Sequence, residues 1–464
     1  MKQFNNFYFE STSFDSKTLT ASFSYSFDEE IFFTEKINFW DNNFQTIKRI
    51  NKRIINNLLF HLQLALGISY YKTFPTNNLI IKSWFLTDDQ IVFWRKFYQN
   101  WLWEFLFRNQ IEPNKLFNFV NTKKIHCEEC QKIEIEMNKY KCKSDKAILP
   151  FGGGKDSIVS FELLEKMWIK SELFSFGKDY EAHKWSAELI WKKRMIIQRE
   201  IDPKLFEMNQ SGYFNGHVPI TWIISFVLTM VSYIYDYKYI VFSNEKSADV
   251  ENLKWKWLNI NHQYSKSVEF EKDFWDYIKK YISDDLKYFS LLNGFFELNI
   301  AKLFSKYPKY FTSFVSCNNN FKVIEKNKYS DQRRCLACPK CYSVFCMLNP
   351  RLEESQILEI FWKDLYQDNL KVNDFRELLW IKWHKPFECV WTTKETALSM
   401  YYSYKNYVKN KEKLPPVLEM FQKEILPTLN EKTISKLEKE IFTRHEEKTI
   451  PTEIVNKLKK VTQS

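Results

Sequence analysis

The pattern of hydrophobic and polar residues first sets apart an N-terminal region. Residues 1 to about 40 alternate hydrophobic and polar positions, which predicts β-strands. Over 44–69 and again over 88–107, hydrophobic residues recur every three or four positions, which predicts amphipathic helices. The two patterns together predict an N-terminal α+β domain that covers residues 1–145.

The pattern changes after this region. Short hydrophobic runs at 147–151, 172–176 and 238–243 alternate with helical segments, which is typical of a parallel α/β sheet. This predicts a central α/β domain over 146–349. Residues 350–464 read as helices and predict a helical C-terminal region.

The loop after the first central strand concentrates a scarce residue. The chain has only 8 glycines among 464 residues, and three of them are adjacent in P-F-G-G-G-K-D-S. A glycine loop between a strand and a helix directs backbone N–H groups and the helix dipole toward an anion. The alternative is a tight turn that binds nothing. The predicted phosphate-binding residues are Gly152, Gly153, Gly154, Lys155, Asp156 and Ser157.

Further candidates follow from position and context. Ser243, Asn244 and Glu245 come directly after a predicted strand, and ligands of parallel sheets bind at the carboxyl ends of strands. His217 lies in G-Y-F-N-G-H-V-P, and His262 lies in the polar run N-H-Q-Y-S-K-S. Either histidine could instead have a purely structural hydrogen-bonding role.

Four cysteines have a spacing that suits a metal. Cys335, Cys338 and Cys341 form C-L-A-C-P-K-C, and Cys317 lies upstream. Four thiolates suit tetrahedral zinc, although an iron–sulfur centre or unliganded thiols remain alternatives. A second pair, Cys127 and Cys130, has no matching partner pair and is left unassigned.

Charge and hydropathy indicate what kind of partner the protein binds and where it is located. The formal net charge of +11 favours an anionic partner, such as a nucleotide, a UDP-sugar or RNA. The N-terminus lacks the apolar core of a signal peptide, which predicts a cytoplasmic protein. Residues 218–235 carry no charge, but Pro219 and several hydroxyl side chains favour a buried helix over a membrane span.

Seven segments resemble one enzyme family. The glycine loop is similar to the S-G-G-x-D-S loop of PP-loop ATP pyrophosphatases, with Gly152 in place of the first serine. The whole set, in order, resembles the bacterial UDP-N-acetylmuramoyl-L-alanyl-L-glutamate epimerases. The segments are L-G-I-S-Y-Y-K (66–72), P-F-G-G-G-K-D-S (150–157), N-G-H-V-P (215–219), S-N-E-K-S (243–247), N-H-Q-Y-S-K-S-V-E-F-E (261–271), C-L-A-C-P-K-C (335–341) and H-K-P-F-E-C-V (384–390).

The resemblance implies a fold and a reaction. The fold would be α/β, with a parallel-sheet, PP-loop-like core. The enzyme would invert the terminal L-Glu of UDP-MurNAc-L-Ala-L-Glu to D-Glu, with ATP and Mg²⁺ as cofactors and AMP and pyrophosphate as products. Asp156 would be the carboxylate on the metal side. Candidates for the catalytic base are His217, His262, His384 and Cys389.

Two other functions remain open. Another PP-loop adenylating enzyme, such as a tRNA thiolase or a deazapurine nitrile synthase, would also fit the basic charge and the cysteines. A zinc-stabilised nucleic-acid-binding protein is less favoured, because the chain has no basic repeat combined with aromatic residues. Trp391 and Thr392 stand where the epimerase family suggests smaller residues.

Overall fold

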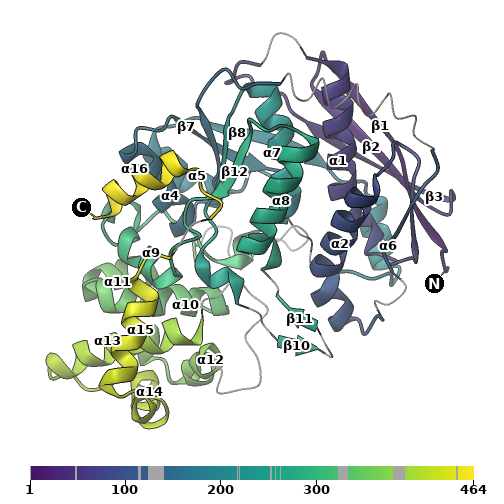
Figure 1. Ribbon diagram of the computed structural model, residues 1–464. Coiled ribbons are helices and arrows are strands. Elements are labelled where there is room, and N and C mark those ends of the chain that lie inside the picture. The colour runs from purple at the N-terminus through teal and green to yellow at the C-terminus, as the bar shows by residue number, and fades with distance from the viewer. Residues whose placement is uncertain are drawn as a thin grey trace.

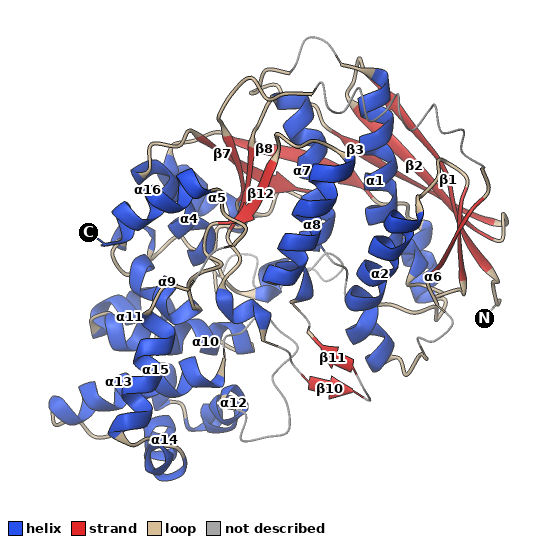
Figure 2. Ribbon diagram, viewed as in Figure 1, coloured by secondary structure: helices blue, strands red, loops and turns tan. Residues whose placement is uncertain are grey.

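The structure is a computed structural model in which a ten-stranded sheet is flanked by helices (Figure 1, Figure 2). It describes residues 2–46, 50–112, 116–123, 140–216, 218, 220–250, 253–255, 258–261, 263–321, 333–379, 392–445 and 448–463.

The strands of the large sheet are β1 (Asn6–Asp15), β2 (Thr20–Phe27), β3 (Ile31–Asn38), β4 (Asn78–Ile81), β5 (Asn118–Asn121), β6 (Ala147–Pro150), β7 (Ser171–Phe176), β8 (Arg194–Glu200), β9 (Tyr239–Phe242) and β12 (Lys287–Ser290). Their order is β12-β9-β6-β7-β8-β3-β2-β1-β4-β5. A separate hairpin consists of β10 (Leu253–Trp255) and β11 (Leu258–Ile260).

The N-terminal helices are α1 (Lys52–Tyr71) and α2 (Asp88–Arg108), followed by α4 (Lys155–Lys166), α5 (Glu181–Ile190), α6 (Lys204–Gln210), α7 (Ile220–Tyr235), α8 (Val268–Tyr281) and α9 (Glu297–Phe304). The C-terminal helices are α10 (Pro339–Leu348), α11 (Glu354–Phe361), α12 (Val372–Leu378), α13 (Thr393–Lys409), α14 (Pro416–Glu424), α15 (Glu431–Phe442) and α16 (Thr452–Gln463).

Five strands, β12-β9-β6-β7-β8, form a fully parallel block. The chain runs from β6 to β7 and β8 on one side, and then returns to β9 and β12 on the other side of β6. The strand order therefore reverses between β6 and β9. In open parallel sheets, ligands bind in the crevice beyond the carboxyl ends of the strands at such a reversal.

The two faces of this block bury different cores. Successive side chains of a strand point to opposite faces. Ile148 and Ile240 accordingly belong to the core that includes α1, α2, α7 and α8. Leu149 and Val241 belong to a second core, shared with α4, α9, α10 and the C-terminal helices. In Figure 1, α1, α2, α7 and α8 lie in front of the sheet, and α10 to α15 lie below it, whereas α16 lies beside α4.

The antiparallel strands β1, β2 and β3 continue the same sheet, because β3 pairs with β8. The buried carboxylate of Glu35 in β3 accepts hydrogen bonds from Arg199 of β8 at 2.6 and 3.3 Å. This ion pair lies at the junction between the antiparallel and parallel blocks. The predicted domain boundary at residue 145 stays a prediction, and strands on both sides of it share one sheet.

The predicted α/β class and the three central strands are confirmed by β6, β7 and β9. The uncharged segment forms α7, which is largely buried. Throughout the described residues, no helix is both long and apolar enough to cross a membrane. A PP-loop core in particular stays a prediction.

Candidate functional site

The glycine loop connects β6 to α4, and its three glycines have different surroundings. Gly153 has a φ of +71°, and a Cβ at this position would lie 2.4 Å from the carbonyl oxygen of Ala182. Gly154 is the N-cap of α4, and a Cβ there would lie 3.3 Å from the carbonyl oxygen of Val315. At Gly152, in contrast, nothing lies within 4 Å of an added Cβ. The loop is therefore tightly packed on one side and open at Gly152.

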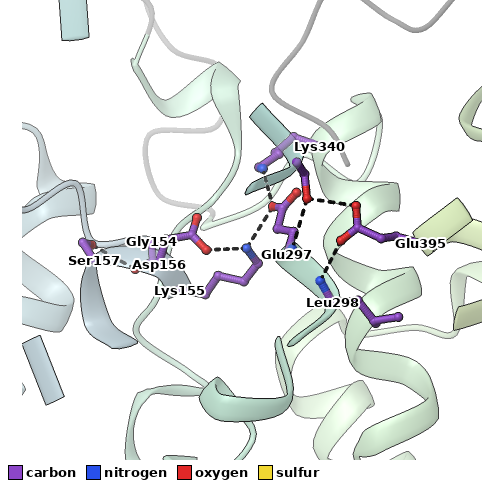
Figure 3. A network of polar contacts seen from close by, with 9 residues as sticks. Gly154, Lys155, Asp156, Ser157, Glu297, Leu298, Lys340 and Glu395 are labelled. Carbon is purple, nitrogen blue, oxygen red and sulfur yellow. Dashed lines mark hydrogen bonds and ion pairs between the residues drawn. The ribbon is translucent and has the colours of Figure 1, made fainter. Parts of the chain in front are cut away.

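The side chains after the glycines form a buried ionic network (Figure 3). Lys155, only 1% exposed, donates from Nζ to Asp156 Oδ1 at 2.6 Å and to Glu297 Oε1 at 2.8 Å. Lys340 of α10 donates to the same Glu297 oxygen at 2.9 Å. Ser157 Oγ donates to the carbonyl oxygen of Gly154 at 3.0 Å. The network thus joins the start of α4 to α9 and α10.

The ionisation of this network follows from its contacts. Burial by itself would raise the pKa of Glu297, but Lys155 and Lys340 lower it to about 2, so the carboxylate stays charged. Burial opposes the charge on Lys155, yet Asp156 and Glu297 raise its pKa. Glu297 Oε2 is buried and accepts no hydrogen bond from a described residue. It is an acceptor that a bound cation or donor would satisfy.

A second carboxylate, that of Glu395, positions the segments that carry the network. Glu395 of α13 accepts hydrogen bonds from Ser247 Oγ at 2.9 Å and from the backbone N–H of Leu298 at 3.0 Å. The same side chain accepts from the backbone N–H of Thr392 at 3.0 Å and completes the capping box of α13. Ser247 Oγ in turn accepts from the N–H of Glu297 at 3.1 Å. Glu395 therefore fixes the start of α9, where Glu297 lies.

The segment after β9 lies where the sequence placed it. Because β9 neighbours β6, Ser243, Asn244 and Glu245 extend from the same edge of the sheet as the glycine loop. Asn244 donates to Ser290 Oγ at 3.0 Å, which links the ends of β9 and β12.

The pKa of Glu245 depends on the charges of the ionic network. Burial raises its pKa to about 7, since the attraction of Lys266 and Lys340 is opposed by the negative charges of Glu297 and Asp156. The structure thus brings Glu245 and Asp156 into one electrostatic environment.

The four predicted metal-binding thiols form one cluster. The Sγ atoms of Cys317, Cys335, Cys338 and Cys341 all lie within 4.8 Å of one another. Cys335 is partly exposed, whereas the other three are buried. Beside the cluster, the N–H of Val315 donates to the carbonyl oxygen of Gly153 at 2.8 Å. The cysteine cluster therefore adjoins the glycine loop.

Several predicted residues lie outside the described residues. These are His217, His262, His384 and Cys389, together with the unassigned Cys127 and Cys130. Gly216, the residue before His217, does lie within the described residues. The carbonyl oxygen of Gly216 accepts a 2.5 Å hydrogen bond from Nζ of Lys72, at the end of α1. Burial and the positive charge of Arg199 lower the pKa of Lys72 to about 8.

Sequence reasoning missed four polar residues near the loop: Glu297, Lys340, Lys266 and Glu395. Two of them stood in segments that had been singled out for other reasons. Lys340 lies between two cysteines in C-P-K-C, and Lys266 lies in N-H-Q-Y-S-K-S. The position of Lys340 between two predicted metal ligands was a signal that could have identified it. A residue between two ligands is held close to the metal site and therefore to the segments that pack against that site.

The structure also contains a cavity of about 820 Å³ between α9, the segment around Arg444 and α16. Its cationic lining residues are Lys302, Lys306, Arg444, Lys448 and Lys459. None of the described site residues lines it. The polar groups of the candidate site converge at the glycine loop instead.

Comparisons with known proteins identify the family of the chain. The model of the MurL N-terminal domain matches residues 1–291, and that of the MurL C-terminal domain matches residues 313–434. Relatives called UDP-N-acetyl-alpha-D-muramoyl-L-alanyl-L-glutamate epimerase occur in Xanthomonas oryzae (30% identical), Salinispora tropica (32%) and a Micromonospora species (31%). Each match covers 86% of this chain and 85–87% of the relative. The chain therefore belongs to the MurL family of UDP-N-acetylmuramoyl-L-alanyl-L-glutamate epimerases.

Proposed function

We propose that this chain inverts the terminal L-Glu of UDP-MurNAc-L-Ala-L-Glu to D-Glu in an ATP-dependent reaction. The names of the relatives support the epimerisation and the substrate. The observation that carries the use of ATP is the glycine loop, which lies at the strand-order reversal and is open at Gly152. Gly154, the last glycine of the loop, is the N-cap of α4, so the positive end of that helix dipole also favours a phosphate at the loop.

The reaction requires activation of the substrate. The α-proton of a carboxylate is very weakly acidic, because its removal would place a second negative charge beside the first. Attack of the glutamate carboxylate on the α-phosphate of ATP forms an acyl adenylate and releases pyrophosphate. The activated acyl group no longer carries the opposing charge, so a base can remove the α-proton. A proton returns on the opposite face, and water then hydrolyses the acyl adenylate to AMP and UDP-MurNAc-L-Ala-D-Glu.

The residues of the site suit these demands. Asp156 is partly exposed and lies in the first turn of α4, and Glu297 Oε2 offers a buried anionic oxygen. These two carboxylates would hold Mg²⁺, which neutralises phosphate charge when it is bound. Lys155 and Lys340 keep Glu297 ionised, so they hold this oxygen ready for a cation.

The proton transfer is assigned to the histidine and cysteine candidates of the sequence. His217, His262, His384 and Cys389 have side chains that exchange protons near neutral pH when their surroundings shift the pKa. Of these, His217 directly follows Gly216, whose carbonyl oxygen is held by Lys72. That contact fixes Gly216 next to the end of α1.

The test is to incubate the protein with UDP-MurNAc-L-Ala-L-Glu, ATP and Mg²⁺ in D₂O. We expect deuterium at Cα of the new D-Glu, and AMP and pyrophosphate as the nucleotide products. Omitting ATP should stop both the inversion and the exchange. D-Glu formed without ATP, or with its original α-hydrogen, would contradict the mechanism. AMP release that requires tRNA instead of the UDP-sugar would indicate a tRNA-modifying enzyme.

A matched pair of variants tests the assignment of Asp156. Asp156→Asn should lower AMP release by about 100-fold or more, because a lost metal ligand removes several kcal/mol of charge stabilisation. Asp145→Asn is the control, since its side chain is 77% exposed and forms a surface ion pair with Lys238. We expect near-wild-type AMP release from the control. Equal activity of the two variants would remove Asp156 from the site.

A further inference from the structure

We propose that Cys317, Cys335, Cys338 and Cys341 bind one zinc ion, and that this ion holds Lys340 and the 315–317 segment against the glycine loop. The metal would be structural, and its effect on catalysis would pass through the position of these neighbours. The part of the inference that concerns nucleotide binding rests on the proposed function. The metal site and its mechanical link to the loop do not.

The arrangement of the sulfur atoms fits tetrahedral coordination. A zinc ion bound to four thiolates at about 2.3 Å places the sulfurs about 3.8 Å apart. The Sγ atoms of Cys335 and Cys341 are 3.9 Å apart, and all four lie within 4.8 Å of one another. Four sulfur ligands favour zinc over the oxygen-preferring Mg²⁺.

The surroundings of the cluster suit its charge. Zinc with four thiolates carries a net charge of −2, which needs compensation in a buried position. Arg334, the residue before Cys335, has a buried guanidinium that donates to the carbonyl oxygens of Ile360 at 2.9 Å and Phe314 at 3.0 Å and interacts electrostatically with Cys341 and Cys317. The N–H of Ala337 lies 3.4 Å from Cys335 Sγ. Cys338 is the N-cap of α10, so the positive end of that helix also faces the cluster.

Two contacts connect the cluster to the glycine loop and its network. Two residues before Cys317, Val315 donates its N–H to the carbonyl oxygen of Gly153 at 2.8 Å. Between Cys338 and Cys341, Lys340 donates to Glu297 at 2.9 Å. A metal that joins these two segments therefore fixes both sides of the ionic network at once.

The first measurement is the metal content of the full-length protein. Elemental analysis should find about one zinc per chain. Replacement by Co²⁺ should give the thiolate-to-cobalt absorption bands of a four-sulfur site. Cys335→Ser should lose the metal, whereas Cys335→His should retain it, because histidine is also a zinc ligand. The control is Cys346→Ala, which removes a buried thiol of α10 outside the cluster and should leave the zinc content unchanged.

The second measurement is hydrogen exchange, which requires no ligand. In Cys335→Ser, the amides of residues 151–157 and of the first turn of α10 should exchange about tenfold faster or more, because local opening costs less free energy. Cys335→His and Cys346→Ala should exchange as the wild type does. The strands β1 to β3 should be unaffected in all variants and report an intact fold.

The outcomes separate the inference from the proposed function. An iron–sulfur absorption spectrum, or a wild-type protein without metal, would overturn the zinc site. Metal loss without faster exchange near the glycine loop would overturn the mechanical link. If the zinc and the exchange results hold but the wild type binds no ATP, the proposed function fails and this inference stands.

Discussion

Gly152 and Gly153 are neighbours whose substitution by alanine should have different effects. Gly153 needs its left-handed backbone and has the carbonyl oxygen of Ala182 2.4 Å from an added Cβ. We expect Gly153→Ala to lower the free energy of unfolding by about 1–3 kcal/mol. Gly152→Ala meets no neighbour, so its stability should change by less than about 1 kcal/mol. Its Cβ would nevertheless occupy the open side of the loop and weaken ATP binding.

Chemical unfolding and titration with ATP check both expectations. The two variants are controls for each other, because they make the same chemical change one residue apart. Unimpaired ATP binding by a stable Gly152→Ala variant would show that the open side of the loop is not the nucleotide site.

At the scale of single residues, the sequence pointed to the glycine loop but could not separate its members. The scarcity of glycine in the chain marked all three positions equally. The need for glycine at position 153 arises from Ala182, which belongs to α5 and contacts the loop only after the chain has folded. The same holds for Glu297, which lies 142 residues from Lys155 in the sequence. Periodicity is a local signal and carries no information about such contacts.

At the scale of elements, a buried carboxylate connects α8 to the end of β12 and to the segment before α16. Glu271 of α8 accepts hydrogen bonds from the N–H of Ser290 at 2.9 Å and from Asn293 Nδ2 at 2.8 Å. It also accepts from the hydroxyl of Thr449. Burial raises its pKa from 4.5 to about 7, although these hydrogen bonds oppose the shift.

This shift predicts a pH dependence of stability. Because the folded state keeps a proton that the unfolded chain releases, the contribution of Glu271 is fully present below about pH 4.5 and is lost as the pH rises to about 7. The loss is up to about 1.4 kcal/mol per pH unit. Glu271→Gln should lack this slope and should be more stable than the wild type at pH 8.

The glutamine variant has a ready acceptor for its new amide group. Asn293 Oδ1 is buried and accepts no hydrogen bond from a described residue. Urea unfolding at pH 5 and pH 8 gives the free energies of both proteins. Parallel pH profiles for the wild type and Glu271→Gln would contradict the raised pKa.

The elements themselves were largely predictable. Alternating residues predicted β2 and β3, and hydrophobic runs between helices predicted β6, β7 and β9. The pairing of β3 with β8 was not predictable, because the hydrophobic pattern of a strand does not specify which other strand it pairs with. Glu35 alternates with Phe33 and Ile37 on the buried face of β3, and only the contact with Arg199 explains how a carboxylate is accommodated there.

At the scale of the whole molecule, the Glu35–Arg199 ion pair joins the two halves of the sheet. Arg199→Met would leave the carboxylate of Glu35, which is fully buried, without its cation. We expect a loss of about 3–5 kcal/mol in the free energy of unfolding. The double variant Glu35→Leu/Arg199→Met should recover much of this loss, because apolar packing replaces the pair.

Urea unfolding of the full chain, followed by circular dichroism, measures both effects. The double variant is the critical comparison. If it is no more stable than Arg199→Met, the cost does not come from an unpaired buried charge.

The same junction has a consequence for synthesis on the ribosome. β3 ends at Asn38 and its partner β8 begins only at Arg194, so the three antiparallel strands are translated well before this neighbour. At rates of about 5–20 residues per second, the edge of β3 waits for roughly 8–30 s. A free strand edge is a template for association with another chain, and an inward-pointing charge is one of the features that discourages it. Until Arg199 is translated, Glu35 is an unpaired, inward-pointing charge at this edge, and we expect it to discourage association of the nascent chain with other chains.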